Sequence, residues 1–286
     1  MVASALSNQT GAALGSLAFP LIGPLGVVAV RQYVAAIALM CVGRPRLRSF
    51  TGSQWRPVLL LAVVFATMNL SLYTAIERIG LGLAVTLEFL GPLSIALAAA
   101  RRRIDAVCAL IAGAGVAAVM RPQPSADYLG MAFGLLGACC WASYILLNRT
   151  VGQRIPGAQG AAAAACVSAV AFLPIGAVLV VRHPPTPAAL GYAAAAGVLS
   201  SALPYLADLL TLRHVPAQAF GLFMSVNPVF AALIGWIGLH QRLGWADCVG
   251  IGAVVAANAV SMFTRPRRTR PLPAAPSGAR AARRGR

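Results

Sequence analysis

The composition of this chain is that of a membrane protein. It has 286 residues, of which 59% are hydrophobic and 10% are charged, whereas soluble domains carry roughly 25% charged residues. An ordinary globular protein is therefore excluded. The chain has 23 basic and six acidic residues, but the arginines lie between apolar segments and in the C-terminal tail. Arginine beside membrane segments indicates topology, so we expect no nucleic-acid partner.

Apolar runs follow one another along the whole chain. A helix needs roughly 20 apolar residues to cross a bilayer, which predicts an all-α integral membrane protein of about ten transmembrane helices. Their predicted ranges are 2–22, 24–42, 57–76, 83–100, 106–120, 128–147, 158–181, 188–212, 217–239 and 244–263. The tail at 265–286, rich in arginine, proline and alanine, is predicted to be disordered.

The arginines in the connections set the predicted orientation. With ten helices, 18 arginines lie on one side of the membrane, tail included, and four lie on the other. Basic residues concentrate on the cytoplasmic side. The sequence therefore predicts a multi-pass protein of the bacterial inner membrane with both termini in the cytoplasm.

The cysteines and histidines form no metal or redox motif. No two of the six cysteines are spaced as C-x-x-C, and the three histidines lie in predicted connections. A zinc site or a redox pair needs such spacing. We therefore expect no metal and no other cofactor.

The predicted span at 83–100 carries Glu88 alone in an apolar run. A carboxylate at that depth costs about 2.5–3.5 kcal/mol, so it is expected to face a protein interior or a wet cavity. It is either a functional group or the partner of a buried arginine, and Arg31, within the second predicted span, is such an arginine. Gly91 and Pro92 follow and are predicted to interrupt the helix, as at transporter binding sites.

The chain also shows a faint internal repeat. With an offset of 136 residues, Pro92 aligns with Pro228, and each proline lies in a predicted helix that follows a short charged turn. Five helices per copy would insert the two copies in opposite orientations. The predicted units are residues 1–127 and 128–264.

Four stretches resemble the EamA-like permeases of the drug/metabolite transporter superfamily, most closely the threonine and homoserine exporter type. They are Gly26–Arg31, Ala84–Leu93, Gly137–Leu146 and Leu199–Tyr205, and the likeness covers nearly the whole chain except the tail. The resemblance implies two inverted five-helix halves, a central cavity, and export of small metabolites driven by proton exchange.

Several polar and aromatic residues within the predicted spans are candidates for a substrate site. An arginine suits a substrate carboxylate, and a carboxylate in an apolar surrounding can bind a proton or the ammonium group of an amino acid. The predicted substrate-binding residues are Arg31, Asn69, Tyr73, Glu88, Trp141, Tyr144, Tyr205 and Asn227, and the predicted proton-coupling residues are Glu88 and Asp208.

Each of these residues also has a structural interpretation. Arg31 could extend to the membrane surface, and Asp208 could lie at the interface. The aromatic residues could form an interfacial belt or pack between helices, and the asparagines could join helices.

The sequence thus predicts a secondary transporter that exports amino acids such as threonine or homoserine, with no enzymatic activity. A multidrug permease, or a permease for other metabolites, is the alternative within the same superfamily. A lipid-modifying enzyme would need paired acids or a histidine–acid pair, whereas the six acids here are dispersed. The sequence leaves monomer and homodimer open.

Overall fold

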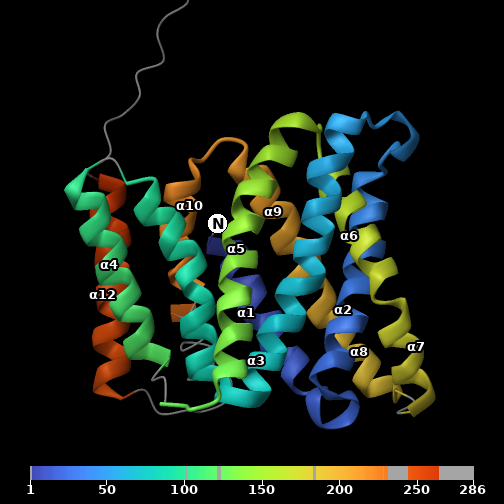
Figure 1. Cartoon of the computed structure of the whole chain (residues 1–286), viewed down its shortest axis with the longest axis horizontal. Helices are drawn as coiled ribbons and strands as arrows, with labels where there is room; N and C mark the ends of the chain where they lie inside the picture. The colour runs from blue at the N-terminus through green and yellow to red at the C-terminus, as the bar shows by residue number, and fades with distance from the viewer. Residues whose placement is uncertain are drawn as a thin grey trace, which may run out of the picture.

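The computed structural model describes residues 2–100, 102–120, 124–182, 185–227, 229–230 and 244–263, and every regular element within them is a helix (Figure 1). The predicted all-α class is confirmed. Three features of the sequence prediction lie outside the described residues: the tail at 265–286, Pro228 of the repeat, and most of the second half of the span at 217–239.

The helices follow the predicted spans closely in the middle of the chain. Most are α-helices, but η1 is a 3-10 helix and η2 is a π-helix. In order they are α1 Val2–Ser16, α2 Phe19–Gly43, η1 Leu47–Ser49, α3 Gly52–Ala98, α4 Arg103–Met120, α5 Tyr128–Arg154, α6 Gln159–Ala171, α7 Leu173–Arg182, α8 Pro187–Gly197, η2 Val198–Ala202, α9 Leu203–Leu212, α10 Ala217–Met224 and α12 Trp245–Phe263.

Five helical segments in the described part of the chain are long and apolar enough to cross a membrane. They are Phe19–Gly43, Gly52–Gly80, Arg103–Met120, Tyr128–Arg154 and Pro187–Leu212. The pair Gln159–Ala171 and Leu173–Val181, bent by 47°, makes a sixth if it is one span. Leu83–Ala98 and Trp245–Ser261 are shorter apolar helices. The protein is therefore a multi-pass membrane protein.

The helices stand side by side in an elongated bundle (Figure 1). The paired helices α4 and α12 form one end, whereas α6 and α7 lie at the other. Between them, α3 packs along α5. The five alanines of Ala161–Ala165, at the start of α6, are completely buried. Small side chains allow this close packing of helices in a membrane.

The predicted end of the first span, residue 22, is wrong. The helix α1 ends at Ser16, and the amide groups of Leu17 and Ala18 donate to carbonyls three residues earlier. A new helix then begins at Phe19, with proline in its first turn, where the missing N–H costs nothing. A kink at Gly23, with a φ of 69°, uses a conformation that favours glycine.

The predicted interruption at Gly91 and Pro92 is also wrong, because α3 continues through both residues. Its non-helical residue is Gly80, with a φ of 78°, between the two spans predicted at 57–76 and 83–100. A side chain at Gly91 would collide with the carbonyl oxygen of Ala138 in α5. Gly91 therefore allows the backbones of two helices to approach closely.

Asp127 determines where α5 begins. Its carboxylate accepts a hydrogen bond of 2.8 Å from the amide of Gly130 and lies 3.0 Å from Nε of Arg78. Both contacts favour the ionised form. The Gly130 amide, followed by the Arg78 guanidinium, lowers the pKa of this carboxyl group.

We predict that Gly91→Ala destabilises the protein by about 1–3 kcal/mol, the usual cost of overpacking a tight interface. The measurement is the thermal unfolding midpoint of the purified protein in detergent. Gly252→Ala is the control, because a Cβ on that residue of α12 would meet nothing within 4 Å. Equal midpoints for the two variants would show that α3 and α5 are not constrained at this position.

We also predict that Asp127→Ala lowers the unfolding midpoint at neutral pH. Because the carboxyl pKa is lower in the folded protein than in the unfolded chain, its stabilisation is present above the unfolded pKa. It disappears as the pH falls through the folded pKa. The gap between wild type and variant should therefore close in acid, and a gap that is constant across the pH series would contradict this account.

Candidate functional site

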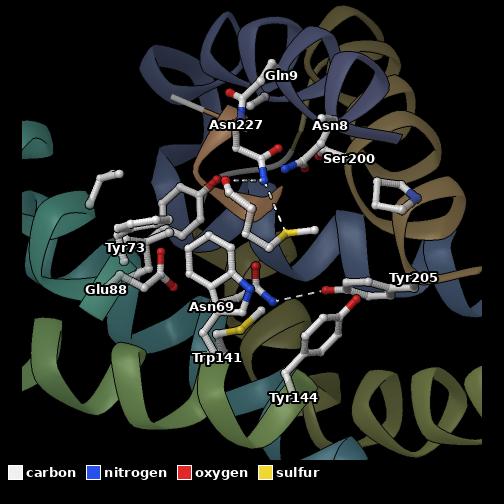
Figure 2. A pocket seen from close by; sticks show the side chains of 18 of the residues that line it. Asn8, Gln9, Asn69, Tyr73, Glu88, Trp141, Tyr144, Ser200, Tyr205 and Asn227 are labelled. Atoms are coloured by element: carbon white, nitrogen blue, oxygen red, sulfur yellow. Dashed lines mark hydrogen bonds between the residues drawn. The ribbon is translucent and has the colours of Figure 1, made fainter. Parts of the chain in front are cut away.

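A cavity of about 450 Å³ lies between the helices, a volume typical of sites for small molecules. All the residues predicted for substrate binding or proton coupling contribute to its wall, and Figure 2 shows most of them. They are Arg31, Asn69, Tyr73, Glu88, Trp141, Tyr144, Tyr205, Asp208 and Asn227. The helices α2, α3, α5 and α9 supply all of these except Asn227, which follows α10.

Arg31 is held by neutral groups inside the protein. Its Nη1 donates to the hydroxyl of Tyr73 at 2.9 Å, and its Nε and Nη2 donate to Oγ of Ser201 at 3.3 and 3.2 Å. Nη2 also donates to the carbonyl of Ser200 at 3.3 Å. These bonds hold the guanidinium between α2, α3 and η2.

Glu88, on α3, is only 5% exposed, and its carboxylate makes no hydrogen bond or ion pair with any described residue. The ion pairs between described residues are Arg78–Asp127 and Arg102–Asp105. The alternative that Glu88 is neutralised by Arg31 is therefore wrong for this structure. Figure 2 shows Glu88 close to Tyr73, on the same part of the cavity wall.

Asp208, on α9, has a different surrounding. It is 7% exposed, and its carboxylate accepts hydrogen bonds from the hydroxyl of Tyr144 at 2.8 Å and from Ser4 at 3.3 Å. The Asp208 side chain therefore lies inside the bundle and not on its outer surface. The cavity thus contains one acid with bonded partners and one without a partner in the described part of the chain.

Three aromatic rings from different helices meet at the wall. Phe65 stacks on Tyr205, with ring centroids 4.2 Å apart, and Tyr144 lies 5.8 and 6.1 Å from these two rings. Asn69 donates to the hydroxyl of Tyr205 at 3.3 Å and to the carbonyl of Phe65 at 2.9 Å. These residues therefore pack α3, α5 and α9 together, and all of them except Phe65 also line the cavity.

The remaining predicted residues make local contacts. Trp141 meets Phe89 edge to face, with centroids 6.5 Å apart. Asn227 donates to the carbonyl and the sulfur of Met224, one turn earlier. These hydrogen bonds of Asn227 therefore stay within its own stretch of chain.

Sequence reasoning missed several cavity residues. Ser4, Asn8 and Gln9 of α1 line the wall, as does Ser200. Two signals could have indicated them: the i, i+4 spacing of Ser4 and Asn8, and the adjacent hydroxyls at Ser200 and Ser201 within an apolar run. Among the described residues, no group of three His, Cys, Asp or Glu side chains could hold a metal ion.

Comparisons with known proteins agree with this architecture. Residues 128–263 match the EamA-like transporter family. The chain is 33% identical over 261 residues to the threonine/homoserine exporter RhtA of Escherichia coli (strain K12), which covers 90% of this chain and 88% of the relative. The RhtA protein of Salmonella typhimurium (strain SL1344) matches to the same extent.

One solved crystal structure superposes with a TM-score of 0.75 over 91% of this chain and 94% of its own. At 16% sequence identity, that likeness shows the fold alone. The match to the exporters along nearly the full length is the stronger finding, and it excludes the lipid-modifying enzyme considered from the sequence. The chain belongs to the EamA-like transporter family, and it is a membrane transporter rather than an enzyme.

Proposed function

We propose that this transporter exports small zwitterionic metabolites, amino acids such as threonine and homoserine among them. One observation carries the proposal: Arg31 and Glu88 line the same cavity without pairing with each other. Charges inside a membrane protein are expensive unless they are compensated. An amino acid supplies a carboxylate for the guanidinium of Arg31 and an ammonium group for the carboxylate of Glu88. The RhtA relatives, described as threonine/homoserine exporters, support this substrate class.

Exchange against protons follows from the chemistry of Glu88. A carboxylate can bind an ammonium group when it is ionised and a proton when the substrate has left, but it cannot do both at once. Glu88 has no other partner among the described residues, so it is available for both. We assign proton coupling principally to Glu88, with Asp208 as a second proton-binding group that Tyr144 and Ser4 hold in place.

The proposal includes the architecture expected from the sequence. It consists of ten transmembrane helices in two inverted units, residues 1–127 and 128–264, with a C-terminal tail and both termini in the cytoplasm of a bacterial cell. The family match over 128–263 supports the second unit. Each unit contributes one acid to the cavity, Glu88 or Asp208. A homodimer is not required for the site, because one chain lines the described cavity.

A wider substrate range is the second candidate. The cavity wall also contains Phe19, Phe89, Met68 and Met224, and aromatic and methionine side chains adapt to varied apolar ligands. This surface would suit organic cations that pair with Glu88 and make no use of Arg31. A panel of such cations in the same transport assay distinguishes the two candidates.

The test is counterflow of radiolabelled threonine and homoserine into proteoliposomes, with and without a pH gradient. We expect wild-type uptake to follow the gradient and Glu88→Gln to abolish the gradient dependence, because an amide cannot exchange a proton. Glu77→Gln is the matched control, since Glu77 lies on the same helix but is exposed. It should behave as the wild type does.

The outcomes separate the parts of the proposal. No wild-type counterflow with either amino acid would refute the amino-acid substrates. Gradient-driven uptake that persists in Glu88→Gln and vanishes in Asp208→Asn would transfer proton coupling from Glu88 to Asp208. Gradient dependence in both variants would refute coupling through either acid.

A further inference from the structure

A π-helical segment lies beside Arg31. In η2, Val198–Ala202, the amide of Leu203 donates to the carbonyl of Val198, five residues earlier. A π-turn inside an α-helix releases carbonyl groups from the usual i to i+4 pattern, and such turns are frequent at functional sites. In this segment, two carbonyls bond to other helices: Leu199 accepts from Ser7 of α1 at 2.7 Å, and Ser200 accepts from Arg31 of α2 at 3.3 Å.

Close packing keeps this segment against α2. A side chain at Gly197, the residue before η2, would lie 2.7 Å from Cβ of Val34 and 3.2 Å from Cα of Arg31. Only glycine leaves room for such an approach. The backbone of α2 at Arg31 is therefore pressed against the start of the π-helical segment, and the guanidinium reaches Ser200 and Ser201 directly.

We propose that η2 and Arg31 together form a carboxylate subsite, in which Ser201 is a positioning residue. Ser201 is 2% exposed and is not among the residues that line the cavity. Its hydroxyl accepts from both Nε and Nη2 of Arg31, so it acts on a ligand through the guanidinium rather than by direct contact. This inference rests on the proposed function and specifies how its substrate is recognised.

The partners of Arg31 explain why the subsite selects an anion. The hydroxyls of Tyr73 and Ser201 and the carbonyl of Ser200 are neutral acceptors, so they fix the plane of the guanidinium while its positive charge stays uncompensated. A carboxylate can then bind by charge-assisted hydrogen bonds, which are about twice as strong as neutral ones. The substrate class is therefore α-amino acids with a free carboxylate, and amino acid amides bind more weakly.

The experiment compares inhibition of radiolabelled threonine counterflow by unlabelled threonine and by threoninamide, which lacks the carboxylate. In Ser201→Ala we expect the inhibition constant of threonine to rise about fivefold to tenfold, the effect of one lost hydrogen bond. The constant of threoninamide should stay the same, because it makes no use of Arg31. Tyr73→Phe, which removes another neutral acceptor, should also raise the ratio of the threonine inhibition constant to the threoninamide inhibition constant.

Ser168→Ala is the matched control. Ser168 is 1% exposed, and its hydroxyl accepts from Gln32, the residue next to Arg31 on α2. The Ser168→Ala variant therefore loses a comparable buried hydroxyl that does not contact Arg31. Its ratio of the threonine to the threoninamide inhibition constant should equal that of the wild type. The Tyr73→Phe variant keeps the test decisive if Ser201→Ala does not fold.

Three results would overturn the inference. The first is equal weakening of threonine and threoninamide in Ser201→Ala, which would indicate a purely structural role. The second is an unchanged ratio in both Ser201→Ala and Tyr73→Phe. The third is the absence of wild-type threonine and homoserine counterflow, which would remove the proposed function and this inference together. An unchanged ratio with intact wild-type counterflow would refute only the inference.

Discussion

A guanidinium has five N–H donors, and the bundle around Arg31 provides neutral acceptors for four hydrogen bonds without a counter-ion. The acceptors come from α3, through Tyr73, and from η2, through Ser200 and Ser201. All are neutral, so they hold the guanidinium in place while its charge is not compensated. This is a stable way to keep a positive charge available for a ligand, provided that three separate helical segments remain packed together.

The two acids of the cavity differ in their hydrogen-bond partners. Asp208 receives hydrogen bonds from α5 and α1, whereas Glu88 receives none from the described residues. A bonded carboxylate has a defined position and a stabilised charge. One without partners must find compensation in a proton or a ligand, since burial penalises an isolated charge. The difference in partners therefore supports different tasks for two side chains of similar chemistry.

Helix breaks were predicted only in part. Gly91 and Pro92 suggested an interruption, but the helix passes through them, because proline within a membrane helix is tolerated where neighbouring groups compensate. The breaks occur instead at Gly23 and Gly80, whose positive φ angles only glycine adopts easily. Both kinks fall between predicted spans, Gly23 between 2–22 and 24–42 and Gly80 between 57–76 and 83–100, so the sequence located these two positions although it misplaced the interruption at Gly91.

The sequence by itself determined the class of protein, most helix positions and part of the set of side chains that line the cavity. Those properties follow from hydrophobicity, helix length and the cost of charge in a bilayer, which are local and additive. The tertiary structure alone decided which polar groups meet. Whether Arg31 would pair with Glu88 or with Tyr73 and Ser201 depends on how α2, α3 and η2 pack. That packing is set by steric contacts between residues far apart in the chain, which no periodicity in a single sequence encodes.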